Sequence, residues 1–548
     1  MSASFPWAPH LTIMQTLFLR LSTTIATHLS DLGRLIPALL LAVLVTPALG
    51  STGKGEVAWR AAANDADISR AFAVAKTESK PVLLYWGASW CPPCNKLKAT
   101  LFNRQDFITQ STSFVAVNID GDLPSAQKLG TRFKVSGYPT MILFNNNGVE
   151  LTRLPGEVEP EQIMAALNFA MAGGRSAEAL LADMRAGKTL SAKEWRTLAF
   201  YSWETGDSQI VSPDALPQLY SDMAAASIAA EPDVAERLWL KAVASSDGKK
   251  EVKGVVIDDA RRERFFTLVR DPAQFRRQTD VLVFGARELA SAMTQANTEA
   301  RTNLLIAYDS ALARLQNDPA LARADRLSCL AARIELARID QAETAMTPSI
   351  PPALQQEVRD VIGQFDKDIT NGYERQAVIP EAAFVLGRAG LWQASDDLLK
   401  ANLAKSISPY YLMSSLGSNA RKQGRNEEAL EWYGKAWAQS KGPATRLQWG
   451  SSYINVLVDL APNDDQKITA TASKIFAEAE QDRGAFHQRS ARSLKRIAEK
   501  LALWNTADAH QADVAKLTKQ LEAICKKLPE TDPQRKNCNE VVVAARKT

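Results

Sequence analysis

Cysteine and histidine are scarce in this sequence, with five and four residues among 548. Cys91 and Cys94 form a Cys-x-x-Cys pair, and no second pair of this spacing occurs. A zinc site usually needs about four ligands, from a second such pair or from two histidines. The sequence therefore argues against zinc, and we expect no metal and no cofactor. Two thiolates suffice for Cu(I), so copper binding stays open as an alternative, although no Met-rich tract supports it.

An excess of charge of one sign is also lacking. Lys and Arg number 65, Asp and Glu number 61, and the two signs are interspersed, which gives a net charge of +4. Proteins that bind nucleic acid usually carry a basic patch or stripe. We therefore expect no nucleic-acid partner.

Long apolar runs are limited to one segment, at residues 35–50. It is shorter than the ~20 residues of a membrane span, and it ends in Ala48-Leu49-Gly50, which fits a signal-peptidase site. We predict that residues 1–50 are a signal peptide, with Met14 as an alternative start, and that the mature protein is periplasmic. An uncleaved N-terminal anchor is the alternative.

The most informative motif is Trp90-Cys91-Pro92-Pro93-Cys94. It lies between a strand-like apolar run and a helical segment. A thiol at the start of a helix can ionise and attack a disulfide, and a second thiol one turn later can release the mixed intermediate. The spacing therefore predicts dithiol–disulfide exchange at Cys91 and Cys94, with an inert structural disulfide as the alternative.

Alternating runs around the motif predict an α/β unit. We expect strands at 81–86, 114–119, 141–144 and 151–154, and helices at 67–77, 94–102, 125–133 and 160–171. The Asn-Asn-Asn-Gly segment at 145–148 is typical of a tight hairpin turn. Together these elements predict a mixed sheet with helices on both faces.

Residues 60–173 resemble a thioredoxin-fold domain, within a predicted domain at 51–173. The resemblance rests on the Cys motif, on Gly137-Tyr138-Pro139-Thr140 and on the order of the elements, and it is greatest to secreted bacterial thioredoxin-like proteins. It implies a thiol-disulfide oxidoreductase in which Pro139 is cis and lies against the Cys pair. It also implies that Trp90, Tyr138 and Pro139 contact the substrate chain.

One departure concerns proton transfer. Many thioredoxins carry a buried acid on the strand that leads to the Cys pair, whereas this chain has Leu83, Leu84 and Tyr85 there. None of these acts as a base at neutral pH. Glu78, Lys80 and solvent remain the candidates that could deprotonate Cys94.

The Pro-Pro dipeptide has a consequence for the redox couple. A helix N-terminus stabilises a thiolate through its free N–H groups, but Pro92 and Pro93 have none, so the amide of Cys94 is the nearest donor. We expect weaker stabilisation of the Cys91 thiolate and a couple tilted toward reduction of substrates. The lost stabilisation is about 0.3–1 kcal/mol, or roughly 10–20 mV in reduction potential. The reduction potentials of oxidising and reducing family members differ by more, roughly 150 mV.

The remaining cysteines are Cys329, Cys525 and Cys538. Cys525 and Cys538 flank a Pro-containing turn between two helical runs, and we predict a structural disulfide there, with two buried thiols as the alternative. Cys329 lies in a helical pattern and is expected to be a buried apolar residue.

The region after residue 176 is predicted to be helical throughout. We expect an all-helical domain at 176–380, in which Trp195, Trp203 and Trp239 are packing residues. At 381–548 we expect tetratricopeptide-like repeats and a C-terminal hairpin, because segments starting at Gly390 and Gly424 lie 34 residues apart, the period of that family. A third unit is expected at 459–479. A generic helical bundle is the alternative.

Two hypotheses follow. In the first, the protein is an exported reductase or isomerase of protein disulfides that receives electrons from a membrane reductase, and its helical repeats bind protein partners. In the second, it is a helical scaffold or assembly protein whose thioredoxin-like domain serves docking or redox sensing. The first requires that the sulfur atoms be accessible and that Pro139 lie beside them.

Overall fold

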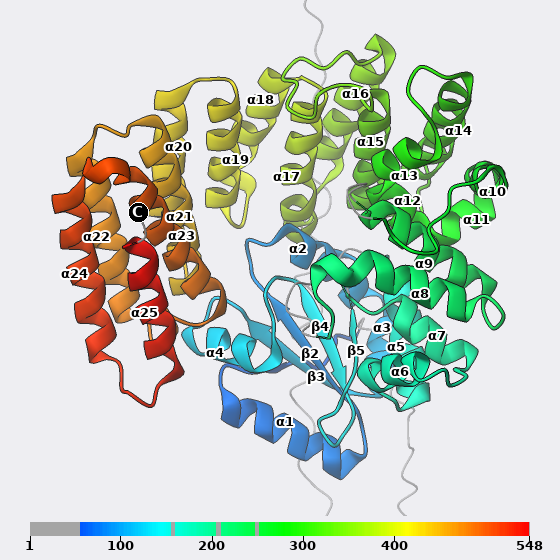
Figure 1. Ribbon diagram of the computed structural model, residues 1–548, viewed down its shortest axis with the longest axis horizontal. Helices are drawn as coiled ribbons and strands as arrows, with labels where there is room; N and C mark the ends of the chain where they lie inside the picture. Colours follow the sequence, from blue (N-terminus) through cyan, green and yellow to red (C-terminus); the bar gives the residue numbers. More distant parts are fainter. Residues whose placement is uncertain (1–54, 155–158, 204–209, 247–250, 547–548) are drawn as a thin grey trace, which may run out of the picture. The chain divides into compact units, whose positions relative to one another are not determined.

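The computed structural model describes residues 55–154, 159–203, 210–246 and 251–546. The predicted signal peptide lies outside these residues. Residues 54–548 form one compact unit, drawn in Figure 1. No helix in the described ranges has both the length and the apolar character needed to cross a membrane.

A five-stranded mixed sheet forms the thioredoxin-like domain, as the sequence predicts. Its strands are β1 (Arg60–Ala61), β2 (Val82–Gly87), β3 (Val115–Asp120), β4 (Thr140–Phe144) and β5 (Glu150–Leu154). The spatial order is β1-β3-β2-β4-β5. β3 pairs parallel to β1 and β2, whereas β4 pairs antiparallel to β2 and β5. β2, which leads to the Cys motif, is therefore central and fully buried.

Helices cover both faces of this sheet (Figure 1). The helices of the domain are α1 (Asp65–Glu78), α2 (Pro92–Ala99), α3 (Gln105–Ser111), α4 (Pro124–Phe133) and α5 (Pro160–Gly173). Alternate β2 residues belong to different cores: Leu83 packs with residues of α2, α3 and α5, and Leu84 with residues of α1 and α4. This two-residue period fixes which helices lie on which face.

Two elements were missed by the sequence analysis. The strand β1 has two residues, too few for an alternating pattern. The helix α3 is short and contains several polar residues, and its N-cap residue Arg104 makes no side-chain cap, so the helix lacks the usual start signals. The predicted helix at 94–102 ends earlier, at Ala99, and continues as a 3₁₀ turn at Leu101–Asn103.

The rest of the described chain is a large all-helical region, again as predicted (Figure 1). Its helices are α6 (Ala177–Arg185), α7 (Ala192–Ala199), α8 (Leu216–Ser227), α9 (Pro232–Ser245), α10 (Asp259–Arg270), α11 (Pro272–Arg277), α12 (Thr279–Phe284), α13 (Ala286–Met293), α14 (Glu299–Gln316), α15 (Arg323–Ala337), α16 (Pro352–Asp368), α17 (Gly372–Arg388), α18 (Trp392–Asn402), α19 (Pro409–Lys422), α20 (Asn426–Gln439), α21 (Pro443–Leu460), α22 (Asp465–Gln481), α23 (Gln488–Trp504), α24 (Gln511–Lys527) and α25 (Pro533–Ala545).

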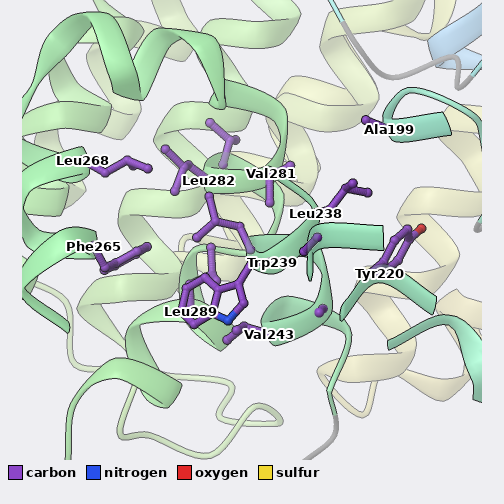
Figure 2. Close-up of a cluster of buried hydrophobic side chains, with 14 of the residues drawn as sticks. Ala199, Tyr220, Leu238, Trp239, Val243, Phe265, Leu268, Val281, Leu282 and Leu289 are labelled. Carbon is purple, nitrogen blue, oxygen red and sulfur yellow. The ribbon is translucent and has the colours of Figure 1, made fainter. Parts of the chain in front are cut away.

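A large apolar core joins α6 to α15. Trp195, Trp203 and Trp239 are all buried in it, which confirms that they are packing residues. Figure 2 shows Trp239 of α9 among apolar side chains that include Val243 and Leu289. Burial of three indole rings contributes substantially to the stability of this part of the region.

The tetratricopeptide assignment stays a prediction. Gly390 and Gly424 have φ of 76° and 71° and lie at the turns between α17 and α18 and between α19 and α20, so two helix pairs follow each other. The helix α17 runs through residues 380 and 381, where the sequence analysis places a domain boundary, with Pro380 inside the helix.

A disulfide joins the last two helices of the region. Cys525 of α24 and Cys538 of α25 have Cα atoms 5.6 Å apart and are both buried in the C-terminal apolar core. The bridge closes a loop between residues 13 positions apart. A loop of this size corresponds to about 3 kcal/mol on the chain-entropy model.

Replacing both cysteines (Cys525→Ser with Cys538→Ser) should therefore make α25 open more easily. We expect the free energy of local opening, measured by amide hydrogen exchange in α25, to fall by up to about 3 kcal/mol. The matched control is Cys91→Ser with Cys94→Ser, which should leave exchange in α25 unchanged. Equal protection of α25 with and without its bridge would contradict this role.

A second prediction concerns Cys329, which is buried in α15. Burial, chiefly, raises the pKa of its thiol to about 12. We expect no reaction with iodoacetamide at pH 7–8 in the folded protein and rapid reaction after unfolding, because the thiolate is the reactive form. Peptide mapping measures this, and labelling of Cys329 in the native chain would contradict it.

Candidate active site

Cys91 is the N-cap residue of α2, directly after the central strand and its loop. The amide of Cys94 donates a hydrogen bond to the Cys91 Sγ at 3.2 Å. Pro92 and Pro93 have no N–H, so Cys94 supplies the first amide of the helix, as the sequence predicts. Asn95 fixes the loop, because its Nδ2 donates to the carbonyl oxygens of Ser89 and Cys91, both at 2.8 Å.

The two cysteines form a disulfide, with Cα atoms 5.3 Å apart. Their neighbour in space is the Gly-Tyr-Pro-Thr segment, whose Thr140 begins β4. The Cys91 Sγ lies 3.5 Å from the carbonyl oxygen of Tyr138, and the Tyr138–Pro139 peptide bond is cis. The prediction of a cis Pro139 is therefore confirmed, and its peptide unit lies beside the reactive sulfur.

The ring of Tyr138 is held against the loop after β3. Its Oη donates to the carbonyl oxygen of Gly121 at 3.0 Å and accepts from Nε2 of Gln127 at 3.1 Å. Burial raises the pKa of Tyr138. Only glycine fits at 121, because a Cβ there would overlap the Cζ and Oη of Tyr138.

Neither of the two side chains weighed as bases, Glu78 and Lys80, lies beside Cys94 in the structure. Burial, and secondarily the charge of Asp120, raise the pKa of Tyr85, so its phenol stays protonated at neutral pH. Glu78 and Lys80 pair with each other at 2.8 Å, before the start of β2. The Cys pair follows the other end of this six-residue strand, ~17 Å away at 3.3 Å per residue. Neither residue can therefore reach Cys94 directly.

Trp90, which we expected to contact a substrate, contacts residues of the helical region instead. Its ring stacks on Tyr411 of α19 at a centroid distance of 6.2 Å and meets Trp449 of α21 edge-on at 5.2 Å. The guanidinium of Arg489 on α23 lies 5.0 Å from the same ring. The backbone carbonyl of Trp90 accepts a hydrogen bond from Gln376 of α17 at 3.2 Å. These contacts bring four helices of the helical region to the Cys motif.

Both cysteines are consequently buried. The exposed fraction is 2% for Cys91 and 0% for Cys94. This differs from the accessible dithiol that the enzyme hypothesis requires. The physical reason is that α17 packs along α2 while aromatic residues of α19 and α21 cover Trp90.

Asp122 is the residue of this site that the sequence analysis missed. Its Oδ2 accepts from the indole N–H of Trp90 at 3.2 Å, and its Oδ1 accepts from Arg489 and from Thr445 of α21. Arg489 also lies 5.1 Å from the Tyr138 ring. The Asp-Gly-Asp segment reads as a turn in the sequence, and nothing there links it to an arginine 367 positions later.

The comparisons with known proteins agree with this geometry. A model of the thioredoxin-like domain matches residues 68–171. The thioredoxin of Pseudomonas aeruginosa is 31% identical over 88 residues, which are 16% of this chain and 77% of that protein. The chain belongs to the thioredoxin family.

Two further relatives are larger. The thiol:disulfide interchange protein DsbD 2 of Pseudomonas aeruginosa is 28% identical over 118 residues, which are 21% of this chain and 20% of that protein. DsbD of Actinobacillus pleuropneumoniae is 32% identical over 96 residues, or 17% of this chain and 16% of that protein. The chain thus spans about a fifth or less of these two relatives, and the likeness lies within the thioredoxin-family domain.

The close approach of Gly121 and Tyr138 gives a test of the site. We expect Gly121→Ala to lower the free energy of unfolding by about 1–3 kcal/mol, because the added methyl forces the ring from its hydrogen bonds. In a Tyr138→Ala background the same change should cost at least about 0.5 kcal/mol less, since the ring is gone. Thermal unfolding of the four proteins measures this coupling, and an equal cost in both backgrounds would contradict it.

Proposed function

We propose that this chain is an exported thiol-disulfide oxidoreductase that acts on disulfides of other exported proteins. Cys91 is the nucleophile and Cys94 the resolving residue. Tyr138 and Pro139 position the substrate chain, and Trp90 contacts it once the ring is released from its own neighbours. The periplasmic location rests on the predicted signal peptide.

The exchange balances as two successive substitutions at sulfur. The Cys91 thiolate attacks one sulfur of a substrate disulfide, which forms a mixed disulfide and releases one substrate thiolate. The Cys94 thiolate then attacks the Cys91 sulfur, which forms the Cys91–Cys94 disulfide and releases the second substrate thiolate. The substrate gains two electrons and two protons, and the protein loses them.

One observation carries the proposal: the surroundings of the Cys91 sulfur. A backbone N–H stands 3.2 Å from it on one side and a backbone carbonyl 3.5 Å on another. The first stabilises a thiolate. The second belongs to the Tyr138–Pro139 peptide unit. The resemblance predicts that the substrate backbone lies beside this unit.

The favoured direction is reduction or isomerisation. The Pro-Pro dipeptide leaves Cys94 as the nearest amide donor, and weaker stabilisation of the thiolate tilts the couple toward the disulfide form. A protein that reduces substrates needs a donor of electrons, and we propose a membrane reductase that delivers them through its own dithiol. Thiol:disulfide interchange proteins among the relatives support exchange between proteins.

The helical region is proposed to recruit the partners. Stacked helix pairs provide extended surfaces that bind peptides or proteins. In this chain the pairs α17–α18 and α19–α20 adjoin the redox motif, because α17 packs on α2 and Tyr411 of α19 stacks on Trp90.

Burial of the Cys pair favours a second candidate function. A helical scaffold that uses its thioredoxin-family domain for docking needs no accessible sulfur, and one that uses it for redox sensing needs access only for small oxidants or thiols. In this alternative the Cys91–Cys94 disulfide holds the loop whose Trp90 contacts the helical region.

Reduction of insulin by the mature protein, with dithiothreitol as electron source, separates the two candidates. We expect turnover by the wild type, and at least about a hundredfold loss with Cys91→Ser, because no other residue forms the mixed disulfide. Cys94→Ser should lose turnover and accumulate the mixed disulfide.

Cys329→Ser is the matched control, since it removes a buried thiol outside the site, and it should keep wild-type activity. Turnover that survives both Cys91→Ser and Cys94→Ser would exclude the enzyme and leave the scaffold.

A further inference from the structure

The proposed function requires that a sulfur of another protein come into line with the Cys91 sulfur. Reacting atoms must approach to about 3–3.5 Å, yet Cys91 is only 2% exposed. The helical region contributes to these surroundings, because Trp90 packs against the Cys pair and is itself contacted by Gln376, Tyr411 and Trp449. We call the helices that supply these contacts and Arg489, namely α17, α19, α21 and α23, the cover.

A cleft at the cover stops short of the sulfur atoms. Its volume is about 390 Å³, and its lining includes Pro92, Pro93 and Tyr411 but neither Cys91 nor Cys94. Small molecules can therefore approach the motif, whereas a folded protein cannot bring a disulfide to it in this arrangement.

The contact between Asp122 and Arg489 connects the domain to the cover. The two side chains are largely buried, with exposed fractions of 12% and 11%. Asp122 also holds the indole N–H of Trp90 and the hydroxyl of Thr445, so one carboxylate binds the motif and two cover helices. Arg489 in turn lies over the rings of both Trp90 and Tyr138.

We infer that the closed cover excludes protein-sized thiols and disulfides from Cys91, so that these react only while it is open, and that the Asp122–Arg489 contact determines how often it opens. The inference rests on the proposed function for its biological meaning, because opening then decides which partners exchange electrons. A partner that separates Asp122 from Arg489 frees Trp90, and with it the face of the motif.

The energetics favour this pair as the determining contact. Charge-assisted hydrogen bonds in a largely buried site are stronger than neutral ones. Removing one member of such a pair leaves the other poorly solvated in the closed state, so the closed arrangement loses stability relative to the open one. Removal of Arg489 also ends its contacts with the two rings.

Access can be measured without any electron transfer. In the full chain with Cys94→Ser, Cys91 is a free thiol while the Cys525–Cys538 disulfide stays intact. Its alkylation is followed by peptide mapping with N-ethylmaleimide and with a maleimide attached to a polymer of protein size. Amide hydrogen exchange of residues 88–99 reports opening independently.

We expect Arg489→Ala to raise the rate with the polymer maleimide about tenfold or more, which corresponds to about 1.4 kcal/mol. The rate with N-ethylmaleimide should rise less, and exchange of residues 88–99 should accelerate. Thr445→Val replaces the hydroxyl that Asp122 accepts with a methyl group. It should raise the polymer-labelling rate and the exchange rate by a smaller factor, and it decides the question if Arg489→Ala does not fold.

Arg264→Ala is the matched control. It removes an arginine of α10 that pairs through two nitrogens with Glu236 of α9, at 2.8 Å each, outside the cover. Both alkylation rates should stay within about twofold of the parent, a change of about 0.4 kcal/mol.

Unchanged polymer labelling in the Arg489 and Thr445 variants would overturn the inference. An equal rise with both maleimides and no gain in exchange would also overturn it, since that pattern reports thiol reactivity and not access. These outcomes are separate from the proposed function. If the protein reduces insulin and Arg489→Ala changes nothing, the proposed function stands and the inference about the cover fails. If Arg489→Ala opens the cover but no variant reduces insulin, the inference stands and the proposed function fails.

Discussion

The position of the Cys91 sulfur is the constraint on which the rest of the site depends. The sulfur is bonded to that of Cys94, and two backbone groups lie against it: the amide of Cys94 on the helix and the carbonyl of Tyr138 on the cis peptide unit. Both derive from the central sheet, because β2 leads to α2 and β4 begins at Thr140. The paired, buried strands β2 and β4 therefore position the Cys91 sulfur between a backbone donor and a backbone acceptor.

The helical region contacts the site close to this sulfur atom. Trp90 and its backbone carbonyl form one face of the Cys motif. In this chain that face meets α17, α19, α21 and α23, and the aromatic contacts with Trp90 make the motif part of a shared interior. Chemistry at this site and movement of the helices are thus coupled by geometry, whichever partner the protein serves.

The sequence was informative where the physics is local. Apolar runs located the four longer strands. The Cys motif located the site, and the resemblance carried by it and by Gly137-Tyr138-Pro139-Thr140 implied the cis bond. The elements β1 and α3 were not predicted. A strand of two residues is too short to show a period, and an uncapped polar helix has no start signal. The burial of Cys91 was not predicted for another reason. It depends on contacts between residues far apart in the sequence, such as Asp122 and Arg489, which local patterns do not connect.

The central claim is that Cys91 forms, and Cys94 resolves, a disulfide with another protein. Trapping tests it most directly: Cys94→Ser is expressed in cells that export it, and disulfide-linked adducts are isolated and mapped by mass spectrometry. The account predicts adducts joined through Cys91, released by reductant and absent when Cys91 is also replaced by Ser. Adducts that persist without Cys91, or none at all, would contradict it.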